Sequence, residues 1–314
     1  MKYSFLLLFS LALGAVCPAA NIVWISDQLP IGSGTTDHDG GASGIFGPGA
    51  GPYPDEGFIT LLSSAGHTVT RFNPSNTTPL NAADIAALNA SDLLIIGRSI
   101  GSGSFDSAAE TLPWNTLITK PLLVTNTYIS RSSRLGWYAS GPTQSDVVSN
   151  PLTFTNPADA VSTYLIDGIS MAGSTTTNSM TEAIIYPNLA VDIRGISLIT
   201  DPVVAGATVI ASSAANAAST FIASWPAGTT LAGTSSAGQV LSGYRMQYLA
   251  GNRESATAPN NTVGSAGFEN FTPDGEGMFL RAVTVAINNG AIPEPASAAL
   301  LALAALSVLR RRRS

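Results

Sequence analysis

Short, almost fully apolar runs alternate with amphipathic segments along the first half of the chain, and this alternation constrains the fold more than any other feature. Buried strands are predicted at residues 21–26, 67–72, 92–96 and 121–125. Helices are predicted to begin near Asp55 and Asn81, and a third is predicted over 105–118 with an interruption at Pro113. After Asp92 the third of these strands is apolar throughout, as a parallel sheet covered on both faces requires. Together with the alternation of strands and helices, this predicts the α/β class.

The second half of the body carries a different pattern. Asn156-Pro157 predicts a helix start, and Asp274 predicts the start of a closing helix that ends before Gly290. We therefore predict an open, mostly parallel, flavodoxin-like sheet flanked by helices, with a β-rich extension. Short strands are predicted at 183–186, 196–200, 207–212, 220–225 and 245–250, the last four as an antiparallel run. The predicted single body covers 21–290, with a parallel half over 21–137, the extension over 138–272 and the closing helix over 273–290.

The two ends of the chain predict export. Lys2 precedes an apolar run over 5–16, and Ala19 and Ala20 supply the small residues that a signal peptidase needs. Residues 1–20 are therefore predicted to be a signal peptide. At the other end, an apolar transmembrane helix is predicted over 296–309, with its arginines held in the cytoplasm by the positive-inside tendency. The tail over 291–314 carries Pro293, Glu294 and Pro295 before this helix, and Arg310, Arg311, Arg312 and Arg313 after it.

This order of Pro-Glu-Pro, apolar helix and arginine cluster closely resembles the PEP-CTERM sorting signal of Gram-negative bacteria. The resemblance implies recognition by an exosortase-type processing enzyme and cleavage near Pro293-Glu294-Pro295. It also implies transient membrane anchoring, then delivery to the envelope surface or the extracellular matrix. An ordinary tail anchor is the alternative, and the sequence leaves open whether the tail is cut.

Composition excludes several classes of function. Cys17, within the predicted signal peptide, is the one cysteine, so the mature body has no disulfide, thiolate metal site or cysteine nucleophile. The chain has 14 basic and 20 acidic residues, for a net charge of −6. Since five of the basic residues lie in the predicted removable ends, the body is more acidic still. This balance argues against nucleic acid and against anionic lipid as partners.

Four segments of the body resemble the class I glutamine amidotransferase-like (ThuA-like) fold. They read SAGHTV, DLLIIGRSIGSG, KPLLVTNTYISRSSRLGW and FTPDGEGMFLRAVTVA. In that family a catalytic cysteine follows the strand that corresponds to 121–125 here, and a histidine comes late in the chain. This chain has Asn126 at that turn and no late histidine. The resemblance therefore implies the fold and speaks against the family's chemistry.

Ser99 is the candidate nucleophile. Gly97-Arg98-Ser99-Ile100-Gly101 has the spacing of a nucleophile elbow and follows a predicted buried strand. The histidines, His38 and His67, both precede Ser99, whereas hydrolases of that type place the histidine last. The alternative is a glycine-rich loop at the carboxyl end of a parallel strand, where open α/β sheets bind ligands.

The loop after the first predicted strand contains a candidate metal site. Asp37, His38 and Asp39 lie there among many glycines, and their oxygen and imidazole groups suit Ca²⁺ or another divalent metal. No other cofactor is predicted. The alternative is an ordinary solvated loop, in which Asp55 caps the helix that follows.

A binding surface is predicted at the carboxyl edge of the parallel strands. Arginine with aromatic residues, as in the segment from Arg131 and Arg134 to Trp137 and Tyr138, suits a sugar or an acidic polymer. The alternative is that Trp137 packs inward, and Tyr244, Arg245, Tyr248 and Arg253 admit the same two interpretations. The function predicted is non-catalytic binding or organisation of exopolysaccharide or envelope components, and the alternative is a secreted hydrolase acting on polysaccharide or ester substrates. The predicted ligand-binding residues are Asp27, Ser99, Asn126, Arg131 and Trp137.

Overall fold

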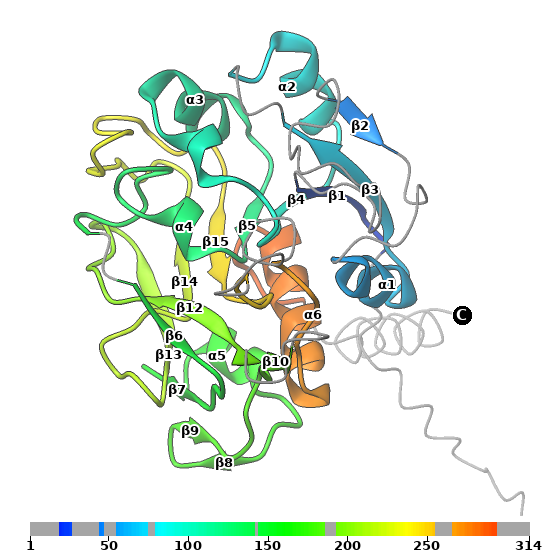
Figure 1. Cartoon of the computed structure of the whole chain (residues 1–314), viewed down its shortest axis with the longest axis vertical. Helices are drawn as coiled ribbons and strands as arrows, with labels where there is room; N and C mark the ends of the chain where they lie inside the picture. Colours follow the sequence, from blue (N-terminus) through cyan, green and yellow to red (C-terminus); the bar gives the residue numbers. More distant parts are fainter. Residues whose placement is uncertain are drawn as a thin grey trace, which may run out of the picture.

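A computed structural model of the chain confirms the α/β class and shows one large mixed sheet with helices packed on it (Figure 1). Most of the predicted signal peptide, the acidic loop and almost all of the predicted sorting tail lie outside the residues that the structure describes. Those residues are 19–26, 44–46, 55–74, 79–141, 144–185, 193–254 and 266–293.

One half of the large sheet is parallel. Its strands lie in the order β3 (Thr68–Asn73), β1 (Asn21–Ile25), β4 (Leu93–Ile96), β5 (Leu122–Val124) and β15 (Arg245–Tyr248), each pair parallel. The four early strands are those predicted from their apolar runs. β15 comes from a distant part of the chain and extends this parallel set beside β5. A short antiparallel strand, β2 (Gly44–Phe46), lies outside β3.

The other half of the sheet is antiparallel, so the predicted β-rich extension continues the same sheet. From β15 the order is β14 (Ile222–Trp225), β13 (Thr208–Ser213), β7 (Leu152–Phe154), β9 (Thr175–Thr176) and β8 (Met171–Ala172). The sheet is therefore mixed, where a mostly parallel one was predicted. The predicted strand at 196–200 is β12 (Ile196–Ile199), which leaves the antiparallel run and pairs with β6 (Gln144–Val147). Another small ribbon joins β10 (Ile184–Ile185) and β11 (Ile193–Arg194).

Helices cover both faces of the parallel half. Alternate residues of β1 and β4 point to opposite faces, as the strand period requires. One face packs on α1 (Glu56–Ser64) and α6 (Pro273–Ile287), which meet where Phe58 contacts Phe279, with 5.9 Å between ring centroids. The other face packs on α2 (Ala82–Leu88), η1 (Ser102–Phe105) and α4 (Thr127–Ser130), and α3 (Ala108–Leu112) contacts η1. A further short helix, α5 (Ala160–Leu165), contacts α6.

The helix starts are partly as predicted. Asn81 caps α2 with a complete capping box, which confirms that prediction. The predicted caps at Asn156 and Asp274 are wrong, because Asp159 accepts the free amides of α5 and Thr272 accepts that of α6. The prediction for Asp55 is also wrong, since its side chain makes no capping hydrogen bond.

Asp55 instead forms a buried ion pair. Its side chain is fully buried, and its two oxygens accept from Arg71 Nη1 and Trp24 Nε1, both at 2.6 Å. Arg71 is itself only 4% exposed and donates also to the exposed Glu56, at 2.9 Å. This arrangement ties the start of α1 to β1 and β3.

The predicted interruption at Pro113 is confirmed, and it takes the form of a π-helical turn. α3 ends at Leu112, and residues Pro113–Leu117 continue as this turn, η2. The side chain of Arg245 is fully buried and donates to carbonyl oxygens within η2, just after it and on the preceding residue Tyr244. Burial lowers the pKa of Arg245 to about 9, so its guanidinium stays charged at neutral pH. The five accepting carbonyls belong to Trp114, Asn115, Ile118, Lys120 and Tyr244.

Candidate functional site

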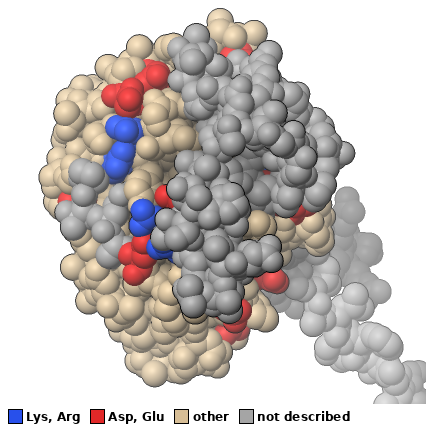
Figure 2. All heavy atoms as spheres, viewed as in Figure 1, with Lys and Arg blue, Asp and Glu red and all other residues tan. Residues whose placement is uncertain are grey.

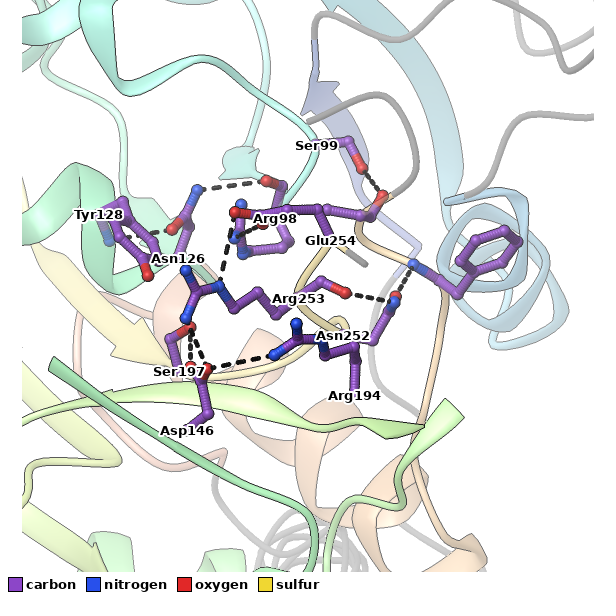
Figure 3. A network of polar contacts seen from close by, with 12 residues as sticks. Arg98, Ser99, Asn126, Tyr128, Asp146, Arg194, Ser197, Asn252, Arg253 and Glu254 are labelled. Atoms are coloured by element: carbon purple, nitrogen blue, oxygen red, sulfur yellow. Dashed lines mark hydrogen bonds and ion pairs between the residues drawn. The ribbon is translucent and has the colours of Figure 1, made fainter. Parts of the chain in front are cut away.

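Three parallel strands, β4, β5 and β15, end at one edge of the sheet, and the loops that follow them form the candidate site (Figure 3). Arg98 follows β4, and Asn126 follows β5 and opens the short helix α4. Arg253 and Glu254 follow β15. The ribbon of β6 and β12 lies against this edge, because Arg253 N donates to the carbonyl of Gly195 at 2.8 Å.

The centre of the site is the ring of Tyr128, on α4. The guanidinium carbons of Arg98, Arg131 and Arg253 lie 5.0, 5.7 and 5.9 Å from its centroid. These distances fall within the range of cation–π attraction. We call these four residues, Arg98, Tyr128, Arg131 and Arg253, the arginine–tyrosine cluster.

Two carboxylates neutralise part of the cluster. Arg98 Nη2 donates to Glu254 at 2.5 Å, and Arg253 Nη1 donates to Asp146 of β6 at 2.5 Å. Asp146 also lies 3.9 Å from a nitrogen of Arg194 on β11 and accepts from Ser197 on β12 at 2.8 Å. Figure 2 shows blue and red atoms side by side on this face of the molecule. The ion pairs therefore fasten the small ribbon to the sheet edge.

Arg131 differs from the other two arginines of the cluster. It is half-buried, and within the described ranges no carboxylate pairs with it. Its Nε is buried and has no hydrogen-bond partner there. Burial lowers the pKa of Arg131, and the nearby charge of Arg134 lowers it further. Around the guanidinium groups of Arg131 and Arg134, positive charge therefore exceeds negative charge.

Asn126 positions the cluster. Its side-chain oxygen accepts from the amide of Tyr128 at 2.9 Å, and its side-chain nitrogen donates to the carbonyl of Arg98 at 3.3 Å. Asn126 is only 1% exposed. It therefore holds the ends of β4 and β5 in register and does not face solvent.

Ser99 is not arranged as a nucleophile. Its side chain is fully buried, and its hydroxyl donates to the carbonyl of Ala266. His67 lies at the opposite end of the sheet, where its Nδ1 accepts from the amide of Ala20. The neighbouring Gly97 has a packing reason, because a Cβ there would lie 2.8 Å from the ring of Trp24. The first glycine of the Gly-x-Ser-x-Gly spacing is therefore explained by packing.

Trp137 does not line the site, which corrects the prediction that placed it there. It is fully buried, lies 5.0 Å from the ring of Trp225 and donates from Nε1 to Asn115 at 3.2 Å. The physical reason is that this large ring fills the core beneath α4. Four further residues of the two predicted arginine–aromatic segments are buried as well: Tyr138, Tyr244, Arg245 and Tyr248. Of the segment from Tyr244 to Arg253, Arg253 is the residue that reaches the site.

The remaining predicted site residues belong to the loop after β1. Asp27, Asp37, His38 and Asp39 lie outside the described residues. Among the residues with described positions, no three His, Cys, Asp or Glu side chains gather in a way that would hold a metal ion.

Sequence reasoning missed Tyr128, Arg98, Asp146, Arg194 and Glu254 as members of one site. Tyr128 had a usable signal, since it lies between Asn126 and Arg131 directly after a predicted strand. Arg98 had one as well, because it adjoins Ser99 in the loop after the predicted strand over 92–96. Asp146, Arg194 and Glu254 had none, because they come from distant parts of the chain, and Glu254 is 156 residues from Arg98.

Replacing Glu254 tests the ion pairs through pH. Burial alone would raise the pKa of Glu254, but the charge of Arg98, a backbone hydrogen bond and Arg253 outweigh it and lower the pKa below 4.5. A carboxyl group with a lowered pKa stabilises the fold above its unfolded pKa, and this contribution is lost as pH falls through the folded value. We expect Glu254→Gln to be less stable than the wild type at pH 7 and to differ less from it at about pH 3. Urea unfolding at both pH values measures this, and a difference that grows on acidification would contradict it.

Comparison with known proteins adds a distant likeness of structure. No protein-family model matches the chain, and no curated protein matches it. A cytoplasmic protein of Salmonella typhimurium, STM3548, aligns with a TM-score of 0.45 and 9% identity, over 84% of this chain and 98% of its own. A cytoplasmic protein of Salmonella typhimurium LT2, STM1381, aligns with a TM-score of 0.38 and 10% identity, over 73% of this chain and 86% of its own.

The predictions drawn from the two ends of the chain concern its location and its anchoring in a membrane. Both neighbours are described as cytoplasmic proteins, whereas the chain ends predict an exported, surface or matrix location for this chain. In the part of the chain that the structure describes, no helix is long and apolar enough to cross a membrane. The predicted helix over 296–309 lies outside that part.

Proposed function

We propose that the chain is a non-catalytic binding domain whose ligand is a polysaccharide, held at the carboxyl edge of β4, β5 and β15. The observation that carries this proposal is the arginine–tyrosine cluster, in which three guanidinium groups share one aromatic ring. Arginine forks and an aromatic ring suit a polar, ring-shaped ligand such as a sugar.

The state of Ser99 supports binding over hydrolysis. A serine nucleophile needs a general base within hydrogen-bond reach. Ser99 donates its hydroxyl to a backbone carbonyl, and the described histidine, His67, lies at the other end of the sheet. We therefore expect Ser99→Ala to leave both ligand binding and polymer length unchanged.

The finer fold assignment also belongs to this proposal. We propose that the parallel half, β3-β1-β4-β5-β15, has an amidotransferase-like arrangement. Asn126 follows β5 at the turn where that family has its cysteine, and its amide links Tyr128 to Arg98. A positioning amide in place of a nucleophile suits a site that binds its ligand without cleaving it.

The test is affinity electrophoresis of the full chain through gels that contain neutral or acidic polysaccharides. We expect one class of polymer to retard the protein, and we expect Arg131→Ala to weaken the affinity about tenfold or more. Lys120→Ala is the matched control, because it removes the same charge at the amino end of β5. Size-exclusion chromatography of the polymer after incubation checks catalysis. Shortened chains would overturn the non-catalytic proposal, and failure to bind any polysaccharide would overturn the binding proposal.

A further inference from the structure

We infer that the site recognises a carboxylate group on the saccharide, so that its ligand class is a polysaccharide with uronic acid units and Arg131 receives the carboxylate. This inference rests on the proposed function and names the chemistry of the same site. It draws on three features of the cluster: its internal carboxylates, its excess of positive charge, and the surroundings of Arg131.

The internal carboxylates show which anion fits these arginines. Glu254 docks on Arg98 at 2.5 Å with one oxygen and lies 3.5 Å from Arg253 Nε with the other. Asp146 docks on Arg253 at 2.5 Å. A guanidinium fork matches the two oxygens of a carboxylate. A ligand carboxylate bound to Arg131 would lie beside the ring of Tyr128. It would make the same kind of ion pair that Arg98 makes with Glu254 and that Arg253 makes with Asp146.

Positive charge is in excess around Arg131. Arg98 and Arg253 each pair with an acid, while Arg131 is 5.7 Å from the ring of Tyr128 and close enough to Arg134 for the two charges to repel. Arg134 donates to the carbonyl of its neighbour Ser133 at 2.6 Å. An anion beside Arg131 would relieve this repulsion and accept from a guanidinium that has no acidic partner among the described residues.

The charge of the whole chain limits how dense the ligand's charge can be. A net charge of −6 repels a polymer as densely charged as double-stranded nucleic acid, which has about one anion per 1.7 Å. At physiological salt, charges more than about 8 Å apart at the surface are largely screened, so a local excess still attracts a single carboxylate. Uronic acid units, with one carboxylate on each sugar ring, therefore fit better than double-stranded nucleic acid or a dense polyphosphate.

The decisive comparison uses the full chain with polygalacturonate and with its methyl ester. The ester keeps the sugar and removes the charge. We expect the acid to bind about tenfold more tightly than the ester, and we expect Arg131→Ala to erase this difference. Arg131→Lys is expected to recover part of it, because lysine keeps the charge without the fork.

A second variant gives a gain that misfolding cannot imitate. Glu254→Gln removes the acid that occupies Arg98, so polygalacturonate is expected to bind about threefold or more tightly. Asp167→Asn is the matched control, because it removes one negative charge from an exposed residue beyond α5. Unchanged or weaker binding by Glu254→Gln would overturn the inference.

The outcomes separate the inference from the proposed function. Equal binding of acid and ester would overturn the carboxylate inference and leave polysaccharide binding in place. Binding of neutral dextran or of a phosphorylated polysaccharide, without binding of polygalacturonate, would do the same. Binding of no polysaccharide at all would overturn both.

Discussion

Asp55→Ala is expected to destabilise the protein by roughly 3–5 kcal/mol, because it leaves the buried Arg71 without its buried carboxylate. The two residues are joined at 2.6 Å, and both side chains are within the core, 0% and 5% exposed. The substitution also removes the acceptor of Trp24 Nε1. Since β1, β3 and the start of α1 meet at this carboxylate, the loss is expected in the global unfolding transition.

Glu56→Ala is the matched control for Asp55. Glu56 binds the same Arg71, but its side chain is 38% exposed, so its loss is expected to cost about 1 kcal/mol or less. Chemical denaturation of the two variants measures both values. Replacing both buried charges, Asp55→Leu with Arg71→Met, is expected to cost less than Asp55→Ala alone, because no buried charge is then left unpaired. Equal losses for Asp55→Ala and Glu56→Ala would contradict this account.

Arg245→Met is expected to cost roughly 3–5 kcal/mol and to loosen the π-helical turn η2. Methionine fills much of the volume, but it donates no hydrogen bond to the five carbonyls that Arg245 gathers. Buried carbonyl oxygens that lose their donors are costly. The charge itself has no carboxylate partner among the described residues, so these carbonyls are what keep it in the core.

Arg281→Met is the matched control for Arg245. Arg281 on α6 is half-buried, and its Nε donates to the carbonyl of Leu165 at 2.9 Å, so we expect a loss of about 1 kcal/mol. Hydrogen exchange adds a local readout. The amide of Ile118, which donates to the carbonyl of Pro113 at 2.9 Å, is expected to exchange faster in Arg245→Met and to stay protected in Arg281→Met. Similar stability and similar exchange in the two variants would contradict the proposed role of Arg245.

The parts of the fold that were predictable depend on local patterns. Local patterns predicted β1, β3, β4 and β5, and of these β4 and β5 are apolar at every position, as strands buried on both faces must be. The capping box of Asn81 involves residues three apart, and the break at Pro113 comes from one residue. Gly290 follows the closing helix with a φ of +88°, a conformation that glycine adopts without strain.

The sheet edge that carries the candidate site was predictable, and so were some of the residues at that edge. Topology places Ser99, Asn126 and Arg131 at the carboxyl ends of β4 and β5, and the structure places them there. Their individual roles were not predictable, because burial decides them. Ser99 and Asn126 are turned into the protein by hydrogen bonds to Ala266 and Arg98, and Trp137 fills the core.

The sequence by itself determined the α/β class, the early parallel strands and the lack of an amidotransferase cysteine. Each of these follows from residue identity or from neighbours within a few positions. Only the tertiary structure decided that β15 pairs with β5, that Tyr128 gathers three arginines, and that Asp55 binds Arg71 instead of capping its helix. The physical reason is that these contacts join residues far apart in the chain. A buried charge or a sheet edge pairs with the group that the packing of the core places beside it.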